Sequence, residues 1–276
     1  MTFLSDITMN QHAAADNDLL VHQDGAVVTI TFNRPQARNA FTLLMYERLA
    51  DIVRSLEERS GVRAVVFQGA GGKAFASGTD IAEFIPFSTP EHALGYERRL
   101  EEILVMIENI RVPTIASVAG ACTGGGLMIA AVCDLRVAAA NAVFGIPVAR
   151  TLGNCLSMSN LVRLERLIGA GRVNTMMLSA QLMRASEALA AGFVTSVAAD
   201  AEALASATTE LASAIAAQAP ITMRVTREAM RLLGRSGGAV DPAAEKSFIL
   251  QAYQSEDFAE GVRAFLAKRT PAWRGR

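Results

Sequence analysis

The order of apolar and polar positions predicts strands that alternate with helices in the first half of the chain. Runs rich in Val, Ile, Leu and Phe predict strands at residues 19–22, 26–32, 62–69, 113–118 and 135–139, with a Gln-Asp-Gly hairpin signal between the first two. Apolar side chains at helical spacing predict helices at residues 42–58, 90–110 and 127–132. This alternation indicates βαβ units and a parallel sheet, in which a ligand site lies beyond the carboxyl ends of the strands.

Helical patterns dominate the second half of the chain. They predict helices at residues 186–191, 201–217, 220–233, 242–253 and 258–267, with a glycine-containing break at 234–240. We therefore expect an α/β fold with a core at residues 18–200. A flexible polar tail at 1–17 would precede the core, and a helical region at 201–276 would follow it.

Two glycine-bearing turns follow strand-like apolar runs. Lys-Ala-Phe-Ala-Ser-Gly-Thr-Asp-Ile occupies residues 73–81, and Gly-Ala-Cys-Thr-Gly-Gly-Gly occupies residues 120–126, directly before the helix predicted at 127–132. A strand, a glycine turn and a helix N-terminus leave backbone N–H groups unpaired and directed at one spot. Two such turns side by side would supply two donors to one developing oxyanion, which is the chemistry that activates a thioester carbonyl.

Composition narrows the classes of function. The formal net charge is −1, so nothing directs the chain to nucleic acid or to an acidic membrane, and no apolar run reaches the roughly 18 residues of a membrane helix. Cys122, Cys133 and Cys155 lack metal-ligand spacing and residues 1–17 lack a secretory signal, which favours reduced thiols in a cytoplasmic protein. A hydrophobic content of 51% favours subunit interfaces, although an Ala-rich core explains it equally well.

Six ordered segments resemble the crotonase (enoyl-CoA hydratase/isomerase) superfamily. They are residues 32–41, 75–81, 120–126, 133–136, 185–194 and 260–269. Six segments in order are far more specific than a single glycine-rich loop. The resemblance implies a crotonase-like spiral of βαβ units and a homotrimer or homohexamer built through C-terminal helices. It also implies a coenzyme A thioester as substrate in fatty acid metabolism, with no prosthetic group and no metal.

The resemblance assigns roles to residues of both turns. The backbone N–H groups of Thr79 and Gly125 would form the oxyanion hole, so that side-chain identity at position 79 matters little. Contacts to coenzyme A would come from Arg38, Ala76, Ser77, Asp80, Ile81, Gly124, Phe265 and Lys268. The last two lie in the tail that, in the family, often reaches over the coenzyme A of a neighbouring subunit. Taken alone, Arg38 is equally a solvated loop charge, and the tail residues fit an ordinary amphipathic helix.

The acid–base residues depart from the family pattern. Family hydratases carry one Glu two residues after the third glycine, where this chain has Met128, and a second Glu after the proline that follows a Phe-Gly pair, where it has Val148. Other branches use an Asp slightly further on, but residues 151–160 contain neither Asp nor Glu. Neither Met nor Val positions water or transfers a proton, so the two-glutamate hydratase mechanism is unsupported.

A few polar residues remain near this pocket. Arg150 is a candidate for binding a substrate carboxylate or pairing with an acid, and Asn154 for donating to a second carbonyl. Cys155 has no histidine nearby in the sequence, and a buried inert cysteine is commoner than a nucleophile.

Three functions fit these observations. The first is an acyl-CoA enzyme of the enoyl-CoA hydratase/isomerase family that stabilises a thioester enolate. The second is a decarboxylase-like member, because loss of CO₂ from a malonyl-type thioester needs an oxyanion hole but no strong base. The third is a catalytically silent protein that binds coenzyme A esters. The missing acids favour the silent protein, and the intact turns count against it.

Overall fold

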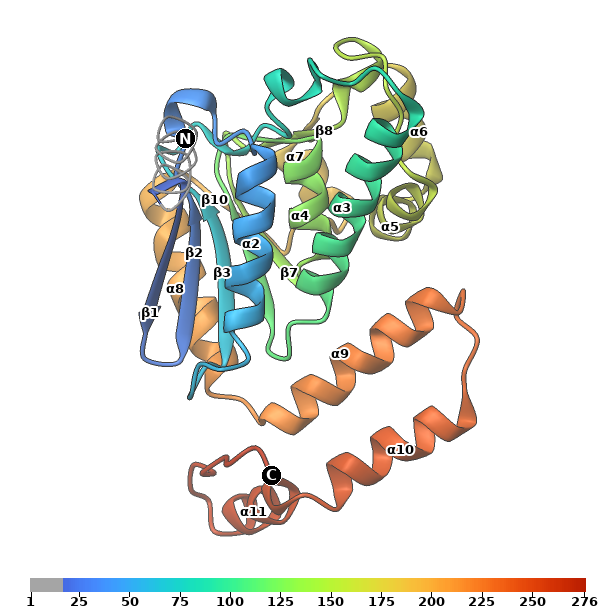
Figure 1. Ribbon diagram of the computed structural model, residues 1–276. Helices are drawn as coiled ribbons and strands as arrows, with labels where there is room; N and C mark the ends of the chain where they lie inside the picture. The colour runs from blue at the N-terminus through green and yellow to red at the C-terminus, as the bar shows by residue number, and fades with distance from the viewer. Residues whose placement is uncertain (1–16) are drawn as a thin grey trace, which may run out of the picture.

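A six-stranded sheet forms the centre of the computed structural model, which describes residues 17–276 (Figure 1). The predicted hairpin is present, with β1 antiparallel to β2 and a positive φ of 52° at Gly25 between them. The other strands run parallel to β2, in the order β1-β2-β3-β5-β7-β10. The bounds are β1 (Leu19–Asp24), β2 (Val27–Phe32), β3 (Ala64–Gly69), β5 (Thr114–Val118), β7 (Leu135–Ala139) and β10 (Ser196–Ala198). The expected tail at residues 1–17 lies outside the described residues, apart from Asn17.

A second sheet of four short strands lies beyond the carboxyl ends of the first. It has the order β4-β6-β8-β9 and consists of β4 (Ala74–Ala76), β6 (Ala121–Thr123), β8 (Val143–Gly145) and β9 (Met183–Arg184). Strands β4, β6 and β8 are parallel and follow β3, β5 and β7 directly in the chain, so the polypeptide passes three times from one sheet to the other. The sequence patterns did not predict this sheet, because three residues are too few to show a period.

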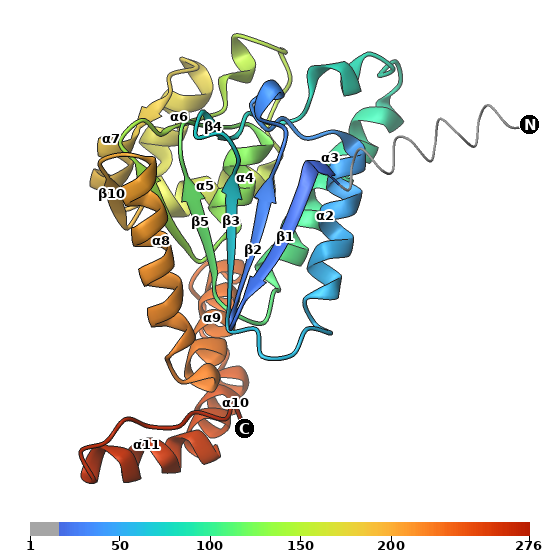
Figure 2. The same ribbon diagram turned by 90° about the vertical axis from the view of Figure 1, so that its left-hand side faces the viewer.

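Helices cover both faces of the main sheet. One face carries α2 (Leu43–Ser55), α3 (Pro90–Glu108) and α4 (Gly125–Val132), and the other carries α8 (Ala201–Ala216) (Figures 1 and 2). Alternate residues of β3 divide between these layers: Val65 and Phe67 join the large core, whereas Val66 packs with Leu204 and Ala212 of α8. This division follows from the two-residue period of a strand that is buried on both faces. The α/β architecture expected from the sequence is therefore confirmed.

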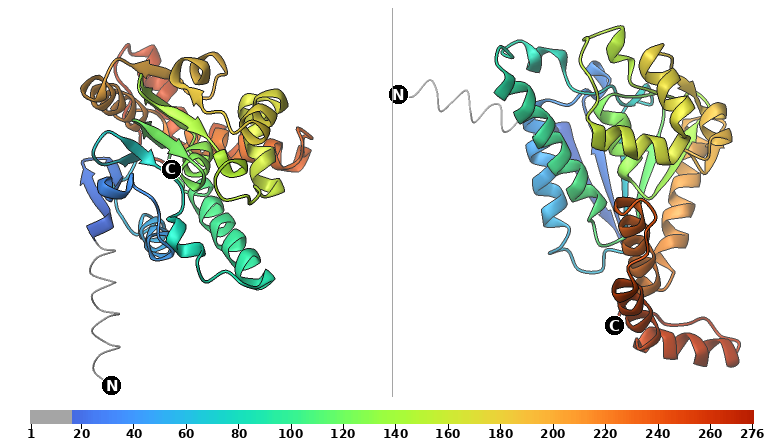
Figure 3. Two further views of the ribbon diagram at one scale, coloured as in Figure 1. Left: turned by 90° about the horizontal axis from the view of Figure 1, so that it is seen from above. Right: turned by 90° about the vertical axis from the view of Figure 1, so that its right-hand side faces the viewer.

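The remaining helices divide into two groups. Beside the second sheet lie α5 (Met158–Ile168), α6 (Ala170–Leu178) and α7 (Ala185–Ala190), of which the sequence patterns predicted only α7. At the other end of the molecule, α9 (Pro220–Arg235), α10 (Pro242–Tyr253) and α11 (Glu256–Leu266) project away from the main sheet (Figures 1 and 2, and Figure 3, right). Within residues 17–276, no helix combines the length and the hydropathy needed to cross a bilayer.

A buried ion pair ties the projecting helices to the core. Arg227 of α9 donates from Nε to Asp134 Oδ2 at 2.6 Å and from Nη1 to the carbonyl of Ile110 at 2.6 Å. The same carboxylate oxygen accepts from the backbone N–H and the hydroxyl of Thr114, at 2.7 and 2.9 Å. The Arg227 side chain is only 9% exposed, so its charge depends on this carboxylate.

Removing that carboxylate should destabilise the protein strongly. We expect Asp134→Ala to lower the free energy of unfolding by about 3 kcal/mol, because it leaves a buried guanidinium without its counter-ion. The matched control is Asp51→Ala, which breaks an exposed pair with Arg54 and should cost under about 1 kcal/mol. Urea denaturation of both variants measures the difference, and equal losses would contradict the anchoring role of Asp134.

Candidate active site

The two glycine turns touch each other at the edge of the second sheet. Strands β4 and β6 are parallel neighbours, and each leads directly into one of the turns. A Cβ added to Gly124 would lie 3.3 Å from the Cα of Gly78, and the two glycines have φ of 55° and 94°. The side-by-side arrangement expected from the sequence is therefore present. The structure differs from the sequence-based expectation in one respect, because each turn follows a strand of the second sheet rather than a strand of the main sheet.

The backbone around Thr79 is oriented by Phe41. The N–H of Phe41 donates to the carbonyl of Gly78 and the N–H of Asp80 donates to the carbonyl of Phe41, both at 2.8 Å. Successive amides of an extended segment point in opposite directions. The N–H of Thr79 therefore points away from Phe41, and it donates to no backbone carbonyl among residues 17–276.

Gly125 is the first residue of α4, where backbone N–H groups have no partner within the helix. Its predecessor Gly124 donates to the carbonyl of Gly145 at 3.0 Å and accepts from the N–H of Met128 at 3.2 Å. The N–H of Gly125 has no carbonyl acceptor in the described part of the chain. The two touching turns thus each carry an N–H group without a backbone acceptor in the described residues, and an oxyanion hole needs two such donors.

Three hydroxyl groups from separate elements meet beside these N–H groups. Thr79 Oγ1 lies 3.0 Å from Tyr46 Oη of α2 and 2.7 Å from Tyr96 Oη of α3, both within hydrogen-bond distance. Tyr46 is 1% exposed, and its ring packs against Phe41 with centroids 4.8 Å apart. The sequence analysis missed both tyrosines. The available signal was a phenol in the apolar stripe of α2, since a buried phenol needs a hydrogen-bond partner.

Burial keeps these phenols neutral. Desolvation, and after it the neighbouring phenol of Tyr96, raises the pKa of Tyr46 far above its ordinary value of 10.0. Burial also raises the pKa of Tyr96. Glu97, the next residue of α3, lies close enough for its charge to raise both phenol pKa values. Burial and, to a smaller extent, Glu101 in turn raise the pKa of Glu97. The phenols therefore stay protonated and able to donate hydrogen bonds at neutral pH.

The predicted coenzyme A residues of the first turn lie together. Ser77 donates its N–H to the carbonyl of Arg38 at 3.1 Å, so the exposed Arg38 loop packs against this turn. Ala76 is buried within β4, whereas Ile81 is 61% exposed.

Asp80 is engaged within the protein. Its Oδ2 lies 3.2 Å from both terminal nitrogens of Arg34, a residue that the sequence analysis did not single out. The same arginine donates to the carbonyl of Ala40 at 2.6 Å and so holds the Arg38 loop against the turn.

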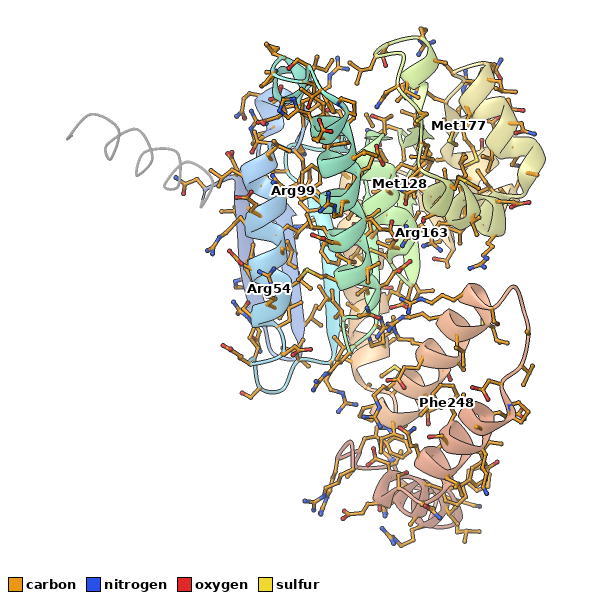
Figure 4. The ribbon with its side chains drawn as sticks, turned by 45° about the vertical axis from the view of Figure 1, so that its right-hand side comes forward. Arg54, Arg99, Met128, Arg163, Met177 and Phe248 are labelled. Atoms are coloured by element: carbon orange, nitrogen blue, oxygen red, sulfur yellow. The ribbon has the colours of Figure 1, made fainter. Side chains whose placement is uncertain are left out.

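The remaining predicted site residues are exposed to solvent, lie far from the two glycine turns or have apolar side chains. Arg150 and Asn154 are exposed in the segment after the short 3-10 helix η3 (Pro147–Ala149). Helix α11, which contains Phe265 and precedes Lys268, lies at the opposite end of the molecule from α4 (Figures 1 and 2). Met128 is fully buried in α4 (Figure 4), and Val148 lies in η3. Neither side chain carries a carboxylate.

The contact between Gly125 and Tyr46 predicts that substitutions at these two positions have coupled effects on stability. A Cβ on Gly125 would overlap Tyr46 Oη, whereas Thr79 Oγ1 and Tyr46 Cζ would both be 3.7 Å away. Tyr46 cannot move easily because it is buried and bonded to Thr79. Gly125→Ala should therefore cost about 1–3 kcal/mol by overpacking. In a Tyr46→Phe background the same change should cost at least about 1 kcal/mol less.

Urea denaturation of the wild type, the two single variants and the double variant measures this coupling. Additive losses would show that the Tyr46 hydroxyl does not contact Gly125.

Comparisons with known proteins identify the family of this chain. The family model described as enoyl-CoA hydratase/isomerase matches residues 22–276. A short-chain-enoyl-CoA hydratase of Clostridium acetobutylicum is 32% identical over 257 residues, which are 92% of this chain and 96% of that protein.

Solved structures of other proteins share the fold. An enoyl-CoA hydratase/carnithine racemase from Magnetospirillum magneticum superimposes with a TM-score of 0.88 at 30% identity, covering 94% of this chain and 96% of that one. An enoyl-CoA hydratase from Bacillus anthracis superimposes with a TM-score of 0.85 at 31% identity, covering 94% and 100%. The fold is therefore that of the crotonases, and the chain belongs to the enoyl-CoA hydratase/isomerase family.

Proposed function

We propose that this protein is an acyl-CoA-processing enzyme that holds the thioester carbonyl between the N–H groups of Thr79 and Gly125. The observation that carries the proposal is the pair of unpaired N–H groups on touching turns. Negative charge develops on the carbonyl oxygen when an enolate forms, and two fixed donors stabilise that charge more than they stabilise the ground state. The position of Gly125 at the N-terminus of α4 adds the positive end of the helix dipole.

Residues of the first turn would hold the coenzyme A part of the substrate. Backbone groups of Ala76 and Ser77 would form hydrogen bonds with the adenine, and Arg38 would contact the phosphates. Ile81 and Gly124 would also contact the coenzyme A. Asp80 would act indirectly, because its carboxylate already pairs with Arg34. No prosthetic group takes part in this proposal.

Phe265 and Lys268 would contact the coenzyme A of a neighbouring subunit. The support is their position at the far end of the chain and the exposure of apolar side chains on the C-terminal helices. These include Met230 at 65%, Phe265 at 83% and Leu266 at 77%. A homotrimer, or a hexamer of two trimers, in the cytoplasm would bring such a tail to the substrate of another subunit and cover this surface.

The reaction would proceed without the two customary glutamates. Met128 is buried and Val148 lies in η3, and neither side chain has a group that exchanges a proton. This observation favours a second candidate, decarboxylation of a malonyl-type thioester. In that reaction, the electrons of the C–C bond pass directly into the enolate as CO₂ leaves. Arg150 would bind the substrate carboxylate before it departs as CO₂.

Hydration of crotonyl-CoA should accordingly be very slow or absent. General acid–base catalysis contributes about 10²–10⁴-fold, and this protein lacks both customary groups. The assay follows loss of the enoyl-thioester absorbance. Calorimetric titration with crotonyl-CoA is the control for binding. Turnover at the rate of an ordinary hydratase would contradict the proposal, because some other group would then have to transfer the proton.

The oxyanion hole itself is tested with acetoacetyl-CoA, whose enolate absorbs in the near ultraviolet. Gly125→Pro removes one donor at a helix position that tolerates proline, although its Cβ meets Tyr46. The test pair is therefore Gly125→Pro and Gly125→Ala, which both place a Cβ against Tyr46, whereas only the proline lacks the N–H. Bound enolate should fall about 10²–10³-fold in the proline variant relative to the alanine variant. Equal enolate in both would exclude the Gly125 N–H as a donor.

A further inference from the structure

The hydroxyl cluster of Tyr46, Thr79 and Tyr96 joins four elements at a single point. Tyr46 belongs to α2, Tyr96 to α3 and Thr79 to the first turn. The Tyr46 hydroxyl also lies against Gly125, the first residue of α4. One buried oxygen therefore contacts both residues whose N–H groups would bind the oxyanion.

Packed aromatic rings fix the positions of these hydroxyl groups. Tyr46 lies against Phe41, whose backbone also bonds to both neighbours of Thr79. The ring of Tyr96 packs edge-on against Phe84 and Phe87, with centroid distances of 5.1 and 6.1 Å. A tyrosine has only two side-chain torsions, so a packed ring leaves its hydroxyl little freedom.

The helix that carries Tyr96 is itself held in place. Arg163 of α5 forms ion pairs with Glu101 and Glu108 of α3 at 2.6 and 2.9 Å (Figure 4). The register of α3, and with it the position of the Tyr96 hydroxyl, is therefore anchored one and three turns further along the helix.

The two faces of Thr79 are held in different ways. Backbone bonds from Phe41 fix the flanking peptides, and the two phenols fix the side chain. We propose that Tyr46 and Tyr96 are positioning residues, which clamp Thr79 and set its separation from Gly125 so that both N–H groups reach one oxygen. This inference rests on the proposed oxyanion function. It also assigns a role to the side chain at position 79, beyond the backbone N–H.

The consequence is a loss of catalysis without a loss of coenzyme A binding. A misplacement of about 1 Å in a reacting geometry can cost about 10²-fold in rate. A cluster that merely satisfied buried hydroxyl groups would affect folding stability but not the charge on a bound thioester oxygen.

The key variants are Thr79→Val and Thr79→Ser. Valine has the shape of threonine and keeps the backbone N–H but lacks the hydroxyl, whereas serine keeps the hydroxyl. Tyr46→Phe and Tyr96→Phe remove the partners one at a time. Tyr253→Phe is the control, because the chain has only three tyrosines and Tyr253 is 63% exposed on α10.

Two quantities are measured for each variant: the enolate fraction of bound acetoacetyl-CoA, from its absorbance, and the Kd for free coenzyme A, from calorimetry. We expect Thr79→Val and Tyr46→Phe to lower the enolate-to-keto ratio about 10–100-fold. The Kd for coenzyme A should change less than about twofold, and Thr79→Ser should stay within about threefold of the wild type. Tyr96→Phe serves as the milder variant if Tyr46→Phe does not fold, as judged by circular dichroism.

Three outcomes separate the possibilities. An unchanged enolate ratio in Thr79→Val and both phenylalanine variants would overturn the positioning role while leaving the oxyanion hole intact. A parallel loss of coenzyme A binding would assign the cluster to general structure and also overturn the proposal. If the wild type binds acetoacetyl-CoA without any enolate absorbance, the proposed function itself fails, and this inference fails with it.

Discussion

The close approach of Gly78 and Gly124 is the constraint on which the site depends. Their φ angles of 94° and 55° favour glycine, and a Cβ on either would lie within 3.6 Å of the other turn. Because β4 and β6 are parallel neighbours, the chain leaves both strands in the same direction and at the same edge. The second sheet therefore converts two separate glycine motifs into one site, with an amide of each turn left unpaired.

The surrounding structure reinforces this geometry from three sides. Phe41 bonds on both sides of Thr79, α4 begins at Gly125, and phenols from α2 and α3 meet the Thr79 side chain. Tyr46 and Phe41 are buried beside this point, and all eight residues of α4 are buried. In such a low-dielectric setting, a fixed N–H dipole stabilises a new negative charge far more than it would in water.

Much of the main architecture was predictable because its signals are local. The Asp24-Gly25 hairpin and helix α2 follow from turn chemistry and from the helical spacing of apolar side chains. The contact between the glycine turns was also expected, since both follow strands. The second sheet was not, because its parallel strands have only three residues each and are specified by register with distant neighbours.

The hydroxyl cluster lay beyond sequence reasoning for a similar reason. Its two hydrogen bonds join residues 33 and 17 positions apart, so they depend on how α2 and α3 pack rather than on any spacing in the chain. The engagement of Asp80 by Arg34, 46 positions away, was hidden in the same way. Met128 and Val148, in contrast, were visible directly in the sequence, and the structure adds that Met128 is fully buried in α4.

A crystal structure of the protein with bound acetyl-CoA tests the central claim most directly. The account predicts that the thioester oxygen lies about 2.7–3.1 Å from the backbone nitrogens of both Thr79 and Gly125. The contradicting result is an ordered acetyl-CoA whose thioester oxygen contacts neither nitrogen.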